Sequence, residues 1–254
     1  MSTSEPMPIM LGHTDYIMSA ELGETRSINI YLPAGYTGDT AYPVVYLLDG
    51  GVDEDFIHIV GLTQFLHGIV DTLPPCIVVG ICNTDRKRDY TYPSAIEADR
   101  KLAPSSGGST KFISFIEREL QPYVEKKYKT STYKTLIGQS LGGLLATEIL
   151  LKRPDLFNHY LIVSPSLWWG KEALLTQAPD LLKAQNDKPR QVFIAVGAGE
   201  EDVMINDAKR LADLLRSSGK QNIKSELLVM PGENHLTILH NAAYKGLEAL
   251  FSGK

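Results

Sequence analysis

Long apolar runs are missing from this chain. No stretch of about 18 consecutive apolar residues occurs, so the sequence predicts no membrane-spanning helix. The first six residues lack the basic segment followed by an apolar one that is typical of a secretory signal. We therefore expect a cytoplasmic protein, with a periplasmic location as the alternative if a signal has been removed.

An excess of positive charge is also missing. The chain has 25 Lys and Arg against 30 Asp and Glu, a formal net charge of −5. Binding to nucleic acid requires basic surfaces that neutralise phosphates, so we expect no nucleic-acid partner. A locally basic run, Arg86-Lys87-Arg88, is interpreted either as a solvated loop or as a contact for an anionic substrate.

Cysteine is scarce, with only Cys76 and Cys82 in 254 residues. They bracket an apolar run, 77–81, that predicts a buried strand. Six steps of about 3.3 Å place them roughly 20 Å apart, beyond the reach of a disulfide. Because the partners of a zinc site are also missing, we expect two buried thiols and no metal.

Short apolar runs bounded by turn residues are what the sequence has instead. Their lack of alternation indicates strands buried on both faces of a parallel sheet. Helical patterns lie between them, which predicts an α/β fold with helices on both faces of the sheet, in one domain spanning 1–254. The expected strands are 44–48, 77–81, 135–137, 160–163, 192–196 and 226–230, and the expected helices are about 56–71, 110–128, 141–152, 208–218 and 236–251.

The N-terminal part of the chain has a different pattern. Residues 15–21 and 26–32 alternate polar and apolar side chains, and Gly23-Glu24 supplies a turn between them. Alternation of this kind is typical of a strand with one solvated face. We expect an antiparallel hairpin at the edge of the sheet.

The pentad Gly138-Gln139-Ser140-Leu141-Gly142 lies between an expected strand and an expected helix. Strand, G-x-S-x-G and helix together indicate a nucleophile elbow, in which a tight turn exposes a strained serine hydroxyl. We expect both glycines to be required, because side chains there would collide with the strand or the helix. The pentad alone would also suit a glycine-rich turn with a bystander serine.

A serine hydroxyl needs a base, and the base needs an acid that orients it. In α/β-hydrolases these follow in the order serine, acid, histidine. The strand expected at 192–196 is followed by three carboxylates, of which Glu200 is the preferred acid, Asp202 a strong rival and Glu201 a weaker one. Their alternative role is a solvated acidic helix start.

Among the six histidines, His235 alone lies in the loop directly after the last expected strand, so we predict that it is the base. A tetrahedral intermediate also needs two oxyanion donors. The Leu141 N–H next to the nucleophile is one. We place the other at Gly50 in the run Asp49-Gly50-Gly51, although the sequence does not say which of these amides points inward.

Four segments, 29–33, 43–50, 138–143 and 164–169, resemble the putative-esterase family of α/β-hydrolases. That family includes enterochelin and salmochelin esterases, feruloyl esterases, S-formylglutathione hydrolase and mycolyltransferases. The likeness covers roughly residues 16–251. The segment 164–169 (SPSLWW) and the continuation of the elbow as Leu-Gly-Gly-Leu are most similar to the siderophore-esterase branch.

The resemblance implies that Ser140 is the nucleophile and His235 the base. It carries less information about the acid, because the branch varies there. It also implies hydrolysis of a small-molecule ester or lactone without metal or organic cofactor. Trp168 and Trp169 should lie near the mouth of the site and wall the substrate pocket, although a packed corner is the alternative.

The sequence therefore favours a serine carboxylesterase that forms an acyl-enzyme, acting on siderophore-type lactones. Arg86 and Arg88 could then contact an anionic part of the substrate. The alternatives are a general short-chain or feruloyl-type carboxylesterase, an acyltransferase of the same fold, and a non-catalytic binding protein. The natural ester and the oligomeric state do not follow from the sequence.

Overall fold

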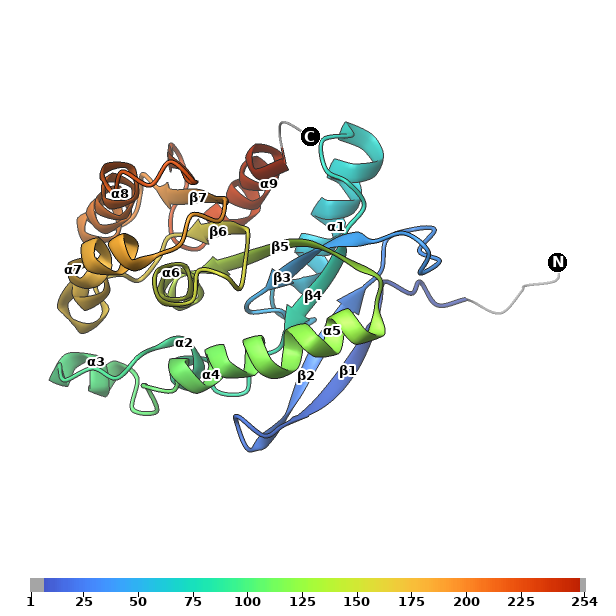
Figure 1. The fold of residues 1–254 in the computed structure, drawn as a ribbon, viewed down its shortest axis with the longest axis horizontal. Coiled ribbons are helices and arrows are strands. Elements are labelled where there is room, and N and C mark those ends of the chain that lie inside the picture. The colour runs from blue at the N-terminus through green and yellow to red at the C-terminus, as the bar shows by residue number, and fades with distance from the viewer. Residues whose placement is uncertain (1–6, 252–254) are drawn as a thin grey trace.

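The protein is described by a computed structural model over residues 7–251 (Figure 1). These residues form one eight-stranded sheet with the strand order β1-β2-β4-β3-β5-β6-β7-β8. Pairing is antiparallel from β1 through β2 to β4 and parallel for the rest of the sheet. The strands are β1 His13–Ser19, β2 Glu24–Tyr31, β3 Tyr42–Leu47, β4 Ile77–Ile81, β5 Thr130–Gln139, β6 His159–Val163, β7 Arg190–Gly197 and β8 Ile223–Met230.

The predicted α/β architecture is confirmed, including the N-terminal hairpin at the edge of the sheet. Its turn lies at residues 20–23, with Gly23 at a φ of 69°, and Glu24 already belongs to β2. The unbroken apolar runs form the central strands, of which β4 and β6 are buried at every residue. Strand β1 at the edge exposes most of its side chains, as its alternating sequence predicts.

Helices cover both faces of this sheet. Helices α1 and α9 lie together on one face, and α4, α5 and α6 lie on the other (Figure 1). The helical elements are α1 Phe56–Phe65, η1 Leu66–Val70, α2 Arg86–Tyr90, α3 Glu97–Leu102, α4 Ser109–Phe115, η2 Ile116–Leu120, α5 Gln121–Lys127, α6 Leu141–Lys152, α7 Trp169–Ala184, α8 Asp202–Ser217 and α9 Ile238–Phe251.

Three of these helices were not expected from the sequence. Helices α2 and α3 have only five and six residues, too few to show a helical period. Helix α7 contains Pro179, and its residues Gly170, Lys171 and Glu172 have positive φ angles, so no continuous pattern identifies it. The expected helices 56–71 and 110–128 are present, and each includes a π-turn, at η1 and η2 respectively.

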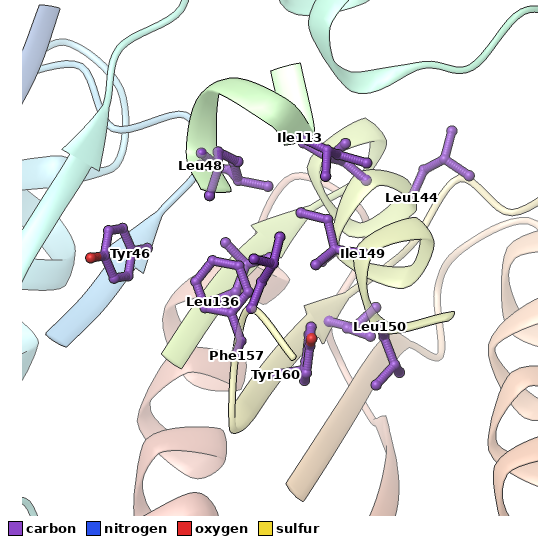
Figure 2. Close-up of a cluster of buried hydrophobic side chains, with 14 of the residues drawn as sticks. Tyr46, Leu48, Ile113, Leu136, Leu144, Ile149, Leu150, Phe157 and Tyr160 are labelled. Atoms are coloured by element: carbon purple, nitrogen blue, oxygen red, sulfur yellow. The ribbon is translucent and has the colours of Figure 1, made fainter. Parts of the chain in front are cut away.

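The packing around α6 fixes where this helix begins. Figure 2 shows its Leu144, Ile149 and Leu150 among buried side chains from β3, β5, β6 and α4. Phe157 makes edge contacts with Tyr46 and Tyr160, at ring-centroid distances of 5.6 and 5.9 Å. Aromatic pairs in this geometry add to the stability gained by burial alone. The N-terminus of α6 is thereby held rigidly at the end of β5, directly after Ser140.

One carboxyl group is buried in this packing without a full set of hydrogen-bond partners. Asp207 lies on α8, which packs against α7, and is only 4% exposed. Its Oδ2 has no hydrogen-bond partner. Burial and, to a smaller extent, the nearby Glu172 carboxylate raise the pKa of Asp207 to about 6, with Arg210 partly offsetting the rise. The native state therefore holds this proton more tightly than the unfolded chain does.

We predict that Asp207→Asn stabilises the protein more at pH 8 than at pH 5. The unfolded pKa is about 3.9, so native stability falls as pH rises from there through the folded pKa. The amide mimics the neutral acid and avoids that loss. Thermal melting should show a larger rise in Tm at pH 8, roughly 2–4 °C, than at pH 5.

Asp213→Asn is the matched control, since Asp213 lies exposed on the same helix. It should leave Tm unchanged at both pH values. An equal gain for Asp207→Asn at pH 5 and pH 8 would contradict the burial argument.

Candidate active site

Ser140 occupies the sharp turn between β5 and α6, with φ 59° and ψ −119°. Such a conformation costs of order 1–3 kcal/mol in a residue other than glycine and persists only where packing enforces it. A Cβ at Gly138 would lie 2.4 Å from the Gly142 carbonyl oxygen, so glycine is required there. A Cβ at Gly142 would meet nothing closer than Asp49 Oδ2 at 3.4 Å, an ordinary contact, so the expected collision at that position is wrong.

The structure brings His235 and Glu200 together beside this turn. His235 follows β8 and Glu200 follows β7, and because these strands are parallel neighbours their ends meet at one edge. His235 Nδ1 lies 2.8 Å from Glu200 Oε2. Glu201 caps α8 and Asp202 begins it, and both are exposed. Of the three carboxylates, Glu200 is thus the one that contacts His235.

Glu200 is held as a carboxylate by three donors. Its Oε1 accepts from the Gly197 N–H at 2.8 Å and from the Ser164 hydroxyl, and its Oε2 faces His235 Nδ1. Burial by itself raises the pKa of Glu200, but the hydrogen bonds from His235, Ser164 and Gly197 outweigh it and hold the pKa below its ordinary value. A carboxylate on Nδ1 favours the tautomer that leaves Nε2 free to take a proton.

Two cavities open on either side of Ser140 and His235, and both residues line each cavity. The first, of about 400 Å³, is walled by Trp168 and Met204. The second, of about 380 Å³, carries three carboxylates and the Arg86 guanidinium. Its lining is Asp49, Glu54, Asp55, Arg86, Gln139, Ser140, His235 and Leu236. A reacting ester bond at Ser140 would thus have room for its acyl part and its alcohol part in separate cavities.

The two tryptophans have different environments. Trp168 is half-buried and lines the 400 Å³ cavity. Trp169 is fully buried, with its Nε1–H donating to the Tyr92 carbonyl at 2.9 Å and its own carbonyl accepting from the Tyr92 hydroxyl at 2.8 Å. The expectation that Trp169 walls the substrate pocket is wrong, because Tyr92 holds it inside the core.

Arg86 and Arg88 also have different environments. Arg86 lines the 380 Å³ cavity, donates to both carboxylate oxygens of Asp49 at 2.6 and 2.9 Å, and reaches the Gln139 carbonyl at 3.2 Å. Arg88 instead pairs with Glu24 and Asp89, which tie it to β2 and α2. Arg88 lines neither cavity, so the structure gives no support to the expected contact of Arg88 with substrate. Arg86 connects the loop after β3 to the elbow.

The Gly50 amide is already engaged. Its N–H donates to the Ile81 carbonyl at 3.0 Å, and a Cβ there would lie 2.3 Å from Gly80 Cα. The expectation that Gly50 supplies the second oxyanion donor is wrong, since this glycine serves the close packing of its loop on β4. The neighbouring amides also have acceptors, Tyr90 Oη for Asp49 and Glu54 Oε2 for Gly51. Leu141, the other proposed donor, opens α6, where a helix leaves its first N–H groups without intrahelical partners.

Three polar residues of the site were missed by the sequence reasoning. Gln139 donates from Nε2 to the His235 carbonyl at 2.5 Å and so joins the elbow to the loop of the base. Ser164 donates to Glu200, and Ser166 places its Oγ 3.3 Å from Ser140 Oγ. Ser164 and Ser166 belong to the SPSLWW segment, in which the sequence suggests a role for the tryptophans alone. A short polar segment directly after a buried strand is the signal that points to them.

Metal ligation finds no support in the part of the chain that the structure describes. Within residues 7–251, no three or more His, Cys, Asp or Glu side chains are grouped so that they could hold a metal ion. Both cysteines are free, Cys76 buried and Cys82 half-buried. Across the same residues, the helices are each too short or too polar to cross a bilayer.

The fold together with the strained serine defines the class of this protein as an α/β-hydrolase. The Putative esterase family matches residues 19–244, and the chain belongs to that family. It is accordingly an ester hydrolase.

Known relatives cover most of the chain. It is 30% identical over 250 residues to the ferri-bacillibactin esterase BesA of Bacillus subtilis, covering 89% of this chain and 85% of that protein. An IroE-like serine hydrolase from Shewanella oneidensis superimposes with a TM-score of 0.87 at 32% identity, over 94% of this chain and 80% of that one. The BES protein from Bacillus cereus gives a TM-score of 0.87 at 28% identity over the whole of both chains.

We predict that Ser164→Ala shifts the acid denaturation of the protein to higher pH. The depressed pKa of Glu200 contributes stability that is present above its unfolded value, about 4.3, and is lost as pH falls through the folded pKa. Removing the Ser164 donor raises that pKa and reduces the contribution. In urea, the free energy of unfolding at pH 7 should be lower than that of wild type by about 1–2 kcal/mol, and this difference should shrink towards pH 4.

Ser109→Ala serves as the matched control, because Ser109 is a buried serine whose hydroxyl has no hydrogen-bond partner. It removes the same atoms without touching Glu200. A Ser164→Ala loss that is the same at pH 4 and pH 7 would show that Ser164 does not act on the Glu200 carboxylate.

Proposed function

We propose that the protein is a serine carboxylic-ester hydrolase working through Ser140, His235 and Glu200. The observation that carries this proposal is the 2.8 Å contact between His235 Nδ1 and Glu200, made at the point where Ser140 and His235 line both cavities. A nucleophile, a base and an orienting acid are the three groups that acyl transfer from an ester requires. The fold alone would not require them in one place.

The reaction proceeds by way of an acyl-enzyme. Ser140 Oγ attacks the ester carbonyl while His235 Nε2 takes its proton, and the Leu141 N–H at the start of α6 faces the oxyanion. His235 then returns the proton to the leaving alcohol as the tetrahedral intermediate collapses. A water molecule attacks the acyl-enzyme with His235 again acting as base, which releases the acid and restores Ser140.

A siderophore lactone or ester is the substrate class that we favour. Relatives named ferri-bacillibactin esterase and siderophore triacetylfusarinine C esterase share 30% and 27% identity with this chain. A large cyclic ester has substituents on both sides of the reacting bond, and both cavities flank Ser140. The 400 Å³ cavity offers the Trp168 indole as an aromatic face, so an aryl group of the substrate would bind on that side.

We predict that Ser140→Ala lowers ester turnover by at least about three orders of magnitude, as removal of a triad member does elsewhere. The panel is p-nitrophenyl acetate, butyrate and octanoate, methyl ferulate and ferric enterobactin, assayed with wild type and variant. Fast Ser140-dependent cleavage of the trilactone supports the siderophore assignment. Cleavage of simple esters alone would indicate a general or feruloyl-type carboxylesterase instead.

Two further results would change the assignment. Added acceptor alcohols that divert the acyl group from water in the product analysis would indicate an acyltransferase. Full activity of Ser140→Ala, or an absence of labelling by a fluorophosphonate, would remove the nucleophile assignment and support a binding protein.

We predict that Trp168→Ala raises KM for catecholate or feruloyl esters by roughly tenfold and leaves kcat nearly unchanged. The indole walls the 400 Å³ cavity, and its loss removes ground-state and transition-state contacts alike. Trp168→Phe keeps an aromatic face and should recover much of the affinity. Equal KM changes for an aliphatic ester without a ring would show that the indole does not select aryl groups.

A further inference from the structure

Ser166 places a second hydroxyl beside the nucleophile. Its Oγ lies 3.3 Å from Ser140 Oγ, and its N–H donates to the Ser140 carbonyl at 3.0 Å. The side chain is 3% exposed and lines the 400 Å³ cavity. Ser166 therefore contacts the nucleophilic residue through both backbone and side chain, and its hydroxyl is largely screened from bulk water.

The turn around Ser166 fixes it in this position. The Leu167 N–H donates to the Pro165 carbonyl at 2.8 Å, and the Trp169 N–H donates to the Ser166 carbonyl at 3.2 Å. Trp169 is itself anchored in the core by Tyr92. The hydroxyl is thus held by a rigid segment, which is the condition for a group that must meet a reacting atom accurately.

The 3.3 Å distance suits a contact that strengthens during the reaction. Neutral O–H···O bonds are usually about 2.5–3.0 Å long, so this bond is weak in the resting site. A negative acceptor shortens and strengthens a hydrogen bond, and catalytic bonds often tighten only when charge develops. Ser140 Oγ becomes that acceptor when His235 removes its proton. Donors nearby are few, because the amides of Asp49, Gly50 and Gly51 serve other acceptors.

We propose that Ser166 is a further catalytic residue, whose hydroxyl donates a hydrogen bond to Ser140 Oγ when that oxygen carries negative charge. The proposal rests on the proposed function of Ser140 as nucleophile. In acylation the Ser140 O–H bond breaks, its proton passes to His235 Nε2, and the bond from Oγ to the carbonyl carbon forms. Ser166 keeps its own proton and stabilises the charge on Oγ.

The same hydrogen bond acts when the acyl group leaves. Water loses a proton to His235 and attacks the carbonyl carbon of the acyl-enzyme. The bond from that carbon to Ser140 Oγ then breaks, and its electron pair returns to Oγ. Ser166 stabilises this departing oxygen until His235 hands back the proton. A residue that donates a hydrogen bond to Oγ therefore affects the rates of both acylation and deacylation. A residue that only lines the cavity affects substrate binding instead.

The test compares Ser166→Ala with Ser166→Cys, which keeps a weak donor of similar size. Phosphonylation by a fluorophosphonate measures attack by Oγ alone, and the burst and steady state with p-nitrophenyl acetate give the deacylation rate. Ser166→Ala should slow both by roughly 10- to 100-fold, the effect of one hydrogen bond to a charged group. The non-covalent affinity for the ester and the final number of labelled sites should not change. Both rates of Ser166→Cys should lie between those of Ser166→Ala and those of wild type.

Ser109→Ala, a buried serine whose hydroxyl has no partner, should retain wild-type rates. The proposal is overturned if Ser166→Ala keeps both rates within about twofold of wild type, or slows only one of them. It is also overturned if Ser166→Cys, with an unchanged Tm, is as slow as Ser166→Ala in both steps. Failure of Ser140-dependent labelling in the wild type would instead refute the proposed function itself, so the two failures are separate.

Discussion

The hydrogen bond between Glu200 and His235 is the interaction on which the site depends. It joins the loops that follow β7 and β8, two parallel neighbours whose ends lie at one edge of the sheet. Parallel pairing places every such loop at that edge, so the elbow after β5 reaches the same place. The donors from Gly197 and Ser164 help to keep Glu200 ionised despite its burial, and Glu200 in turn contacts Nδ1 of His235.

Much of the fold was predictable because its signals are local. Apolar runs along the chain identified the central strands, and alternation identified the hairpin of β1 and β2. Ser140 can be identified in the sequence by its flanking glycines and by the strand and helix predicted on either side. The order of Glu200 and His235 along the chain follows from the order of the strands. The choice of Glu200 over Asp202 was open in the sequence, because only the folded turn between β7 and α8 shows which carboxylate contacts His235.

The remaining site residues were not predictable because their roles depend on partners distant in sequence. Trp168 and Trp169 are adjacent, yet Tyr92 draws one of them into the core. Arg86 and Arg88 are two residues apart, yet Arg86 pairs with Asp49 beside the elbow and Arg88 pairs with Glu24 on β2. Residue type alone says nothing about such pairings.

The acidic lining of the 380 Å³ cavity has a consequence for the direction of the reaction. An ester is neutral at its reacting bond, whereas the acid that hydrolysis releases is an anion at neutral pH. Asp49, Glu54 and Asp55 outnumber the Arg86 guanidinium there, so the cavity repels the new carboxylate but not the bond from which it came. In the proposed reaction, the lining charge would thus favour departure of the acid over its return to Ser140.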